Sequence, residues 1–351
     1  MKKYQVLYNY IETNRAGSKA PRDIISIAEK CGYIPLYITC NTKKTGLLYK
    51  IIRQIGFLRC WISNLVKVES GSIILLQYPI YQKELVRNFI LQSAKKLKHI
   101  KIISLVHDVD QLRYKSNNNS KEFKAMLQHS DVIIVHNAKM LQWFAEQNVE
   151  EKKLVNLQIF DYLSDNANVE YPKFKRAIII AGNLDICKAT YLSELSRIKN
   201  IEIHLYGPNY NENNYKNNNL YYHGSFPSDE IPHKLKEGFG LVWDGTSIEE
   251  CTGLMGQYLK YNNPHKLSLF LVSGLPVVIW RQAAEADFVR KNGLGICVDS
   301  LLDLESALSN ICEEEYKEMA AHVAIVGNSL KAGAYTQKAL EEACRRINCH
   351  G

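Results

Sequence analysis

Residues 239–280 constrain the fold more than any other stretch of the chain. They contain an apolar run at 240–243, a largely apolar helical segment that follows Asn263 and Pro264, and a second apolar run at 276–280. Proline suits the first turn of a helix, and a glycine such as Gly274 commonly ends one. Two apolar strands joined by an apolar helix indicate a parallel sheet that is covered on both faces. The segment therefore predicts an α/β domain.

Short apolar runs alternate with helical segments along the rest of the chain as well. Strands are predicted at 5–8, 35–38, 73–78, 101–106, 131–136, 177–181, 201–206, 240–243, 276–280 and 295–298. Helices are predicted at 20–30, 45–66, 82–97 and 137–147, after Ser228, from Asn263, from Ala283, and at 302–311, 313–327 and 336–347. A chain of 351 residues is long for one core, and the polar stretch at about 148–174 is the predicted linker. We therefore expect domains at 1–165 and 175–330, followed by a C-terminal helix within 331–351.

Two polar residues follow the predicted strand at 101–106. They are His107 and Asp108. Ligands of open α/β sheets bind beyond the carboxyl ends of the strands, so both residues are candidates for contact with a substrate. An equally good alternative for Asp108 is a turn former or helix cap.

Three loops that lead from a strand into a helix carry the residue types that bind phosphate. They contain Gly17 and Ser18, then Gly182, Asn183 and Lys188, and finally Asn263, Pro264, His265 and Lys266. Free N–H groups at a helix start attract anions, and a lysine adds a full positive charge. The glycine spacing excludes a P-loop. At each loop the alternative is an ordinary turn whose charged side chain faces water.

Four motifs together resemble one known family. They are AGSKAPRDI at 16–24, VHDVDQLR at 106–113, GFGLVWDG at 238–245 and NNPHKLSLFLVSGLPVV at 262–278. The chain resembles a bacterial GT-B glycosyltransferase family that includes β-1,6-galactofuranosyltransferases and adhesin-modifying second glucosyltransferases. The resemblance covers nearly the full length. It implies two Rossmann-like domains that face a cleft, with the acceptor on the first and the donor nucleotide on the second. It also implies that the C-terminal helix folds back on the first domain.

The resemblance implies an activity as well. A hexose, galactofuranose or glucose, would pass from a UDP-sugar to an acceptor glycan during assembly of a bacterial surface polysaccharide or glycoprotein. Neither a metal ion nor a cofactor is implied. We expect Asp108 to act as the base, with His107 beside it. Residues expected to bind UDP are Gly17, Ser18, Gly182, Asn183, Lys188, Gly224, Phe226, Asn263, Pro264, His265 and Lys266.

Three details qualify the resemblance. Leu269 stands where many GT-B enzymes carry a ribose-binding glutamate, so the ribose must be held in another way. Phe226 is expected to stack on the base, the alternative being a hydrophobic staple on a helix capped by Ser228. Asp108 and Asp110 also look like the metal-binding carboxylates of the GT-A transferase fold. A pattern of three residues is weak, and the rest of the chain does not resemble GT-A.

Charge is divided unevenly between the two halves of the chain. Residues 1–125 hold 22 Lys and Arg against 8 Asp and Glu, whereas the remainder holds 22 against 28. A basic first half suggests an anionic partner, such as lipid headgroups, a lipid-pyrophosphate acceptor or nucleic acid. No nucleic-acid-binding motif is present. The helix at 45–66 has basic residues around apolar ones, which fits either an anionic membrane surface or a core-packing helix with a solvated rim, the latter being favoured.

The expected partners are therefore a UDP-sugar donor, a glycan or lipid-linked glycan acceptor, an anionic membrane touched by the basic first domain, and further copies of the chain. Nine cysteines without metal-ligand spacing indicate reduced thiols. No apolar run follows Met1, Lys2 and Lys3, so we expect a cytoplasmic protein. The basic first domain suggests a peripheral position at the inner face of the membrane. A nucleotide-sugar epimerase of the same fold and a non-catalytic partner subunit of a transferase complex remain as alternatives.

Overall fold

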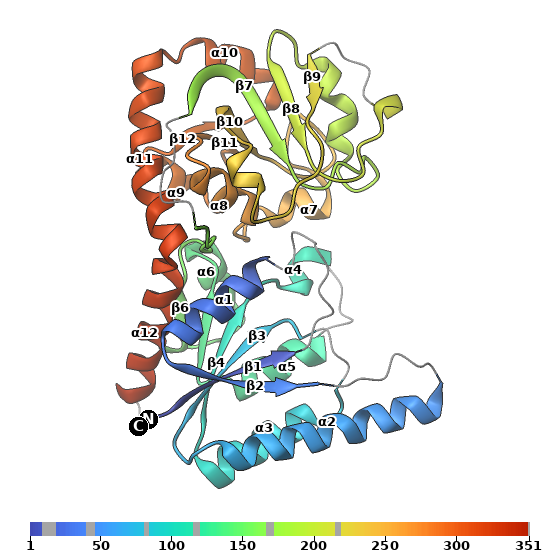
Figure 1. Cartoon of the computed structure of the whole chain (residues 1–351), viewed down its shortest axis with the longest axis vertical. Coiled ribbons are helices and arrows are strands. Elements are labelled where there is room, and N and C mark those ends of the chain that lie inside the picture. The colour runs from blue at the N-terminus through green and yellow to red at the C-terminus, as the bar shows by residue number, and fades with distance from the viewer. Residues whose placement is uncertain are drawn as a thin grey trace.

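Two α/β lobes make up the computed structural model, which describes residues 1–8, 19–39, 46–80, 84–114, 120–165, 172–214 and 219–349 (Figure 1). Both lobes contain a six-stranded parallel sheet with helices around it. The prediction of two Rossmann-like domains in a GT-B arrangement is confirmed.

The N-terminal lobe has the strand order β2-β1-β3-β4-β5-β6. Its elements are β1 (Lys3–Tyr8), α1 (Lys19–Lys30), β2 (Tyr33–Ile38), α2 (Leu47–Lys67), β3 (Ile73–Tyr78), α3 (Arg87–Lys98), β4 (Lys101–Val106), α4 (Asp110–Tyr114), α5 (Ser120–His129), β5 (Val132–Val135), α6 (Ala138–Glu146), η2 (Glu151–Lys153) and β6 (Leu154–Asn156). The order reverses direction between β1 and β3, because β2 lies on one side of β1 and every later strand lies on the other.

The C-terminal lobe has the strand order β12-β11-β10-β7-β8-β9. Its elements are β7 (Lys173–Ala181), η3 (Thr190–Arg197), β8 (Glu202–Tyr206), η4 (Glu212–Asn214), β9 (Leu220–Tyr222), η5 (Ile231–His233), β10 (Glu237–Val242), α7 (Gly253–Tyr258), α8 (His265–Val272), β11 (Val277–Trp280), α9 (Ala286–Lys291), β12 (Gly295–Val298), η6 (Leu301–Asp303) and α10 (Leu304–Ser309). Here the order reverses between β7 and β10. The helix α8 lies directly on β10, since a Cβ at Gly240 would come within 2.1 Å of the Phe270 ring.

Two C-terminal helices, α11 (Glu313–Ala332) and α12 (Ala334–Cys349), run along one side of both lobes (Figure 1). They meet at Gly333, whose φ of +78° ends α11. Asp161 then accepts the N–H groups of Tyr335 and Thr336 at 3.2 and 2.6 Å, which caps the start of α12. Leu340 and Ile347 of α12 are buried in the core of the N-terminal lobe. Because each such side chain contributes about 1.5–3 kcal/mol on burial, α12 holds the lobes together. The predicted fold-back is confirmed.

Some sequence expectations were wrong in detail. The predicted linker at 148–174 contains β6, which the pattern missed because a three-residue strand carries no periodicity. The helix predicted from 82 begins at Arg87, and the one predicted from Ala283 begins at Ala286. No α-helix follows Ser228: a turn leads into the short 3₁₀ helix η5, so Ser228 is not a helix cap.

The helix α2 packs on a different face from the one that the sequence suggested. The sequence favoured a helix whose apolar residues pack in the core. Phe57 and Trp61 are instead its two buried side chains. Leu47, Leu48, Ile51, Ile52, Ile55 and Ile62 are exposed. The helix has two apolar faces, and sequence periodicity alone does not say which of them meets the sheet.

Candidate active site

The carboxyl ends of the strands in one lobe are turned toward those in the other. Segments that follow β4, β5 and β6 contact segments that follow β10, β11 and α7 through hydrogen bonds across the seam between the lobes. In open parallel sheets, ligands bind at the carboxyl edge where the strand order reverses. Each lobe has such a point, at β1 and β3 and at β7 and β10, and the two edges form the candidate active site.

His107 lies at the end of β4 in the N-terminal lobe. Its backbone N–H donates to the Tyr78 carbonyl at 2.7 Å, and its Nε2 lies 2.7 Å from Gln77 Oε1. The ring stacks on Phe160 with centroids 5.4 Å apart. Burial, with the nearby positive charge that His136 and His265 would carry, lowers the pKa of His107 to about 3. His107 is therefore a neutral imidazole at physiological pH.

Asp108 connects the two lobes. Its Oδ2 accepts from Arg113 Nη1 at 2.7 Å, and its Oδ1 accepts from the Tyr258 hydroxyl of the C-terminal lobe at 3.2 Å. The Tyr258 oxygen in turn accepts the Val109 N–H at 3.0 Å. Burial raises the pKa of Asp108 above its usual value, outweighing Arg113 and Tyr258, which both stabilise the carboxylate. The side chain is still about a quarter exposed, at 26%. A reachable carboxylate with a raised pKa suits general base chemistry.

Glycines surround the facing edge of the C-terminal lobe. Those with positive φ that closely follow strand ends are Gly182, Gly207, Gly224 and Gly245. A Cβ at Gly207 would lie 1.7 Å from the Gly182 carbonyl oxygen, so the turns after β7 and β8 touch through their backbones. A Cβ at Gly182 itself would meet nothing within 4 Å. The backbone at Gly182 is therefore open to close approach by a ligand.

The other predicted residues of the loop after β7 are exposed. Asn183 Oδ1 accepts from the Asp185 N–H at 3.1 Å and from Asn209 Nδ2 at 2.8 Å, which shapes the turn. The Lys188 side chain is exposed, and its backbone N–H donates to the Asp185 carbonyl at 2.9 Å. Both residues thus lie in the loop after β7, where the sequence placed a phosphate-binding loop.

Lys266 reaches the reversal point between β7 and β10 from α8. Its Nζ donates to the Trp243 carbonyl at 2.8 Å and lies 3.7 Å from Asp244 Oδ2, immediately beyond β10. Because β7 is the neighbour of β10 in the sheet, the turn that contains Gly182 follows the adjacent strand. Leu269, one turn later on α8, is buried in the lobe core, where it cannot serve as a polar ribose ligand.

The residues just before Lys266 join the lobes. The Asn263 N–H donates to His136 Nδ1 at 3.0 Å, and Asn263 Nδ2 donates to the Gln158 carbonyl at 3.2 Å. The His265 ring stacks on Tyr162 at 4.9 Å, and its Nε2 lies 3.3 Å from the Asp161 carbonyl. Pro264, the N-cap of α8, is buried. The predicted role of Asn263, Pro264 and His265 in UDP binding stays a prediction.

Gly224 and Phe226 open the loop after β9. The Gly224 carbonyl accepts the Gly207 N–H at 2.9 Å, which brings this loop beside the Gly182 turn. Phe226 is partly buried, with its ring 6.4 Å from that of Tyr206 and 5.3 Å from Lys234 Nζ. Because no α-helix follows, Phe226 is not a helix staple.

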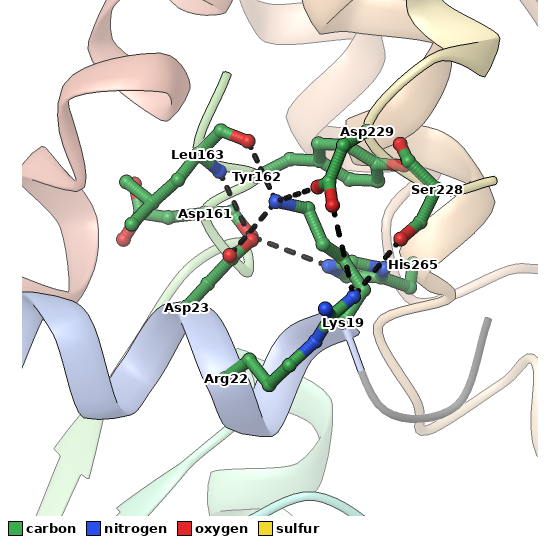
Figure 2. Close-up of polar contacts among 9 residues, drawn as sticks. All are labelled: Lys19, Arg22, Asp23, Asp161, Tyr162, Leu163, Ser228, Asp229 and His265. Atoms are coloured by element: carbon green, nitrogen blue, oxygen red, sulfur yellow. Dashed lines mark hydrogen bonds and ion pairs between the residues drawn. The ribbon is translucent and has the colours of Figure 1, made fainter. Parts of the chain in front are cut away.

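The same loop continues into an ionic contact that the sequence did not reveal (Figure 2). Buried Lys19, at the start of α1, lies 2.9 Å from both Asp23 Oδ1 and Asp229 Oδ1, and its Nζ donates to the Leu163 carbonyl at 2.7 Å. Arg22 donates to the Ser228 hydroxyl at 3.1 Å. Lys19 directly follows Gly17 and Ser18, which lie outside the described residues. The predicted first phosphate loop therefore leads into a lobe-to-lobe ion pair.

A third hydrogen-bonded contact between the lobes lies at the start of α6. Asn137 Nδ2 donates to Glu285 Oε1 at 2.8 Å, and burial raises the pKa of Glu285 to about 8. Beside this contact the seam widens into a groove of about 470 Å³. The groove is lined by Lys139, Gln142, Trp143, Glu146, Lys260, Tyr261, Arg281, Gln282, Ala283, Ala284 and Asp287. In the part of the chain that the structure describes, no three His, Cys, Asp or Glu side chains are grouped to hold a metal ion.

Comparison with known proteins places this arrangement among sugar-transferring enzymes. Residues 3–159 match the family described as "Glucosyltransferase 3-like, N-terminal domain", and residues 178–343 match "Glucosyltransferase 3-like, C-terminal domain". The chain is 31% identical to the β-1,6-galactofuranosyltransferase WbbI of Escherichia coli over 93% of this chain and 94% of that protein. It is 27% identical to glucosyltransferase 3 of Streptococcus gordonii, again over 93% and 94%.

A solved structure shares the fold at much lower sequence identity. The HepE protein of Anabaena, crystallised in complex with UDP, has a TM-score of 0.62 to this chain at 9% identity. The match covers 98% of this chain and 99% of HepE. At 9% identity this similarity shows a shared fold and nothing further.

Proposed function

This chain belongs to the glucosyltransferase 3-like family and is a hexosyltransferase, and we propose that it moves a hexose from a UDP-sugar to an acceptor glycan. The product would enter a bacterial surface polysaccharide or glycoprotein. WbbI, the relative with 31% identity, is a galactofuranosyltransferase, and HepE was crystallised with UDP, which supports a UDP-linked donor. The observation that carries the proposal is the position of Asp108, a reachable carboxylate opposite a glycine-lined edge.

The donor diphosphate would bind at the reversal point between β7 and β10. Backbone N–H groups of the Gly182 turn, the start of α8 and the side chains of Lys188 and Lys266 provide positive potential there. As the bond between the anomeric carbon and the β-phosphate oxygen breaks, its electron pair stays on UDP. Fixed positive groups stabilise that developing charge without a metal ion. The Lys266 ammonium would exchange its contact with the Trp243 carbonyl for the phosphate oxygens.

The acceptor would react at the opposite edge. Its hydroxyl oxygen bonds to the anomeric carbon, and the hydroxyl proton passes to the Asp108 carboxylate. His107 is neutral and hydrogen-bonded to Gln77, so we assign it the positioning of the β4 end rather than proton transfer. An acceptor of several sugars also needs a groove. The one beside α6 begins at Lys260 and Tyr261, two residues after Tyr258, and contains the aromatic Trp143.

Calorimetry with UDP-, GDP- and dTDP-sugars, together with release of the nucleotide in the presence of an acceptor glycan library, tests the proposal. We expect the UDP-sugars to bind most tightly and UDP release to require an acceptor. Interconversion of UDP-sugars without any acceptor would instead identify an epimerase. Binding without turnover for every donor and acceptor would identify a non-catalytic partner subunit.

A further inference from the structure

An apolar surface covers the outer side of the N-terminal lobe. The helix α2 turns Phe57 and Trp61 toward the sheet, and the Trp61 indole N–H donates to buried Glu84 at 2.8 Å. Its opposite side carries Leu47, Leu48, Ile51, Ile52, Ile55, Ile62 and Val66, all exposed. Leu47 and Val66, near the two ends of the helix, are 76% and 75% exposed. At 1.5 Å per residue, these 21 residues form an apolar stripe about 30 Å long.

Neighbouring elements extend the stripe. The helix α3 lies beside α2 (Figure 1), and the segment from Leu85 through α3 exposes Leu85, Phe89 and Leu97 by 83, 72 and 79%. The edge strand β2, which α2 contacts, exposes Ile34 on the side of the sheet that packs against α2. We call this surface the α2–α3 face. So many large apolar side chains on one side of a lobe indicate an interaction surface, since single exposed apolar residues are ordinary but continuous patches are not.

Basic residues accompany the apolar ones, and acidic residues do not. The sequences of α2 and α3 contain eight Lys and Arg and no Asp or Glu. Three of the basic residues of α3 already have partners within the N-terminal lobe. Arg87 pairs with Glu122, Lys95 pairs with Asp131, and Lys98 donates to backbone carbonyls. Arg59, Lys67 and Lys96 are exposed. Lys50 is exposed as well, but it stands two helical turns before Phe57 and therefore on the inward side of α2. The partner of this face must therefore accept both apolar insertion and positive charge.

We propose that the α2–α3 face docks on an anionic lipid surface. An amphipathic helix that inserts its apolar side into the headgroup region while lysines and arginines meet anionic lipid satisfies both requirements. A second copy of the chain would cover the apolar side chains but would not balance the positive charge. A symmetric contact through α2 would bring together two basic helices that contain no acidic residue. Within the described ranges, no helix combines the length and hydrophobicity needed to cross a bilayer.

This docking fixes how the protein would stand on the membrane. Figure 1 places α2 and α3 on the side of the N-terminal lobe that faces away from the C-terminal lobe. The C-terminal lobe would then project toward solvent, where it meets a soluble nucleotide. The inference does not rest on the proposed reaction, because it uses only the exposed side chains of the N-terminal lobe.

Vesicle co-sedimentation of the full chain tests the proposal. We expect binding to vesicles of phosphatidylcholine with 30% phosphatidylglycerol, little binding to phosphatidylcholine alone, and weaker binding at high salt. The double variant Ile51→Glu/Ile55→Glu should lower the partition coefficient at least about tenfold, because it places charge in the apolar stripe. The matched control is Ile325→Glu, which alters an isoleucine of α11 that is 68% exposed. It should bind as the parent does.

Three results would overturn the proposal. One is equal partition of the parent into neutral and anionic vesicles, or into neither. Another is unchanged binding by the double variant when circular dichroism shows that it is folded. The third is that light scattering shows a dimer for the parent but a monomer for the double variant, and that the parent does not bind vesicles. This result would show that a second copy covers the face.

Discussion

The carboxyl edges of the two sheets, which face each other between the lobes, differ in the residues that they present. On the N-terminal lobe, the residues at the strand ends carry polar side chains, among them Gln77, His107, Asp108 and Asn137. On the C-terminal lobe, glycines follow the strands closely, and the Gly182 and Gly207 turns touch backbone to backbone. The N-terminal edge presents polar side chains at fixed points, whereas the C-terminal edge presents mostly main chain, with the Lys266 side chain beside it.

This difference separates two tasks. A diphosphate carries charge over many oxygens, and backbone N–H groups and helix starts bind it without side chains that reach far. Removing a proton from a hydroxyl needs one titrating atom in one place. The two edges should therefore respond differently to mutation. Side-chain changes on the N-terminal edge should lower turnover, whereas added atoms on the C-terminal edge should lower nucleotide affinity.

The largest effect should come from Asp108→Asn. The amide keeps the shape of the side chain but cannot accept a proton, so we expect turnover to fall at least about 100-fold. Affinity for UDP should stay nearly unchanged, because we place the nucleotide at the other edge. Steady-state rates and calorimetry with UDP measure the two quantities.

The control for Asp108→Asn is the same loss of charge far from the seam. Glu313→Gln alters an exposed glutamate at the start of α11, which pairs with Lys317 on the surface. It should change neither turnover nor affinity. Normal turnover in Asp108→Asn would remove this residue from the mechanism. A parallel loss of UDP affinity would mean that its bond to Tyr258 serves to hold the lobes.

A smaller effect is expected from Gly182→Ala. Gly182 has φ +148°, and an added Cβ would meet no protein atom within 4 Å, so the chain still folds with about 1–2 kcal/mol of backbone strain. The methyl group would instead occupy the space through which a phosphate approaches. We expect UDP affinity, measured by calorimetry, to fall about tenfold.

Gly71→Ala is matched to this change. Gly71 lies between α2 and β3, has φ +73°, and would likewise bring an added Cβ within 4 Å of no protein atom. Urea unfolding should show a loss of stability in both variants, while only Gly182→Ala loses affinity. Equal UDP affinities for the two would contradict the placement of the nucleotide at the C-terminal edge.

The sequence anticipated these edges unequally well. Strands, their parallel arrangement and the residues directly after them could be predicted, because apolar runs are local and His107, Asp108 and Gly182 stand next to them. Contacts across the seam could not. Tyr258 is 150 residues from Asp108, and Asp229 is 210 residues from Lys19. Which apolar face of α2 packs inward was also hidden, because both faces have helical spacing.

The smallest effect concerns Tyr258, which no sequence pattern singles out. Its hydroxyl donates to Asp108 and stabilises the charged carboxylate, so it lowers the pKa of Asp108 against the larger effect of burial. Tyr258→Phe removes that donor and should raise the Asp108 pKa further. Because the base acts only when deprotonated, the acid limb of the kcat/KM profile should move to higher pH, by less than about one pH unit. Well above that limb, the rate should fall less than about tenfold.

A second phenol shows whether this shift reports Asp108 or merely a weakened fold. Tyr316 is fully buried and donates its hydroxyl to the Gly238 carbonyl at 2.7 Å, on the far side of the C-terminal lobe from Asp108 along β10. Tyr316→Phe should cost about 1 kcal/mol of stability and leave the pH profile in place. If Tyr258→Phe also leaves the acid limb unmoved, or moves it to lower pH, then the rate-limiting base is not the carboxylate that Tyr258 touches. A different residue of the N-terminal edge would then have to accept the proton.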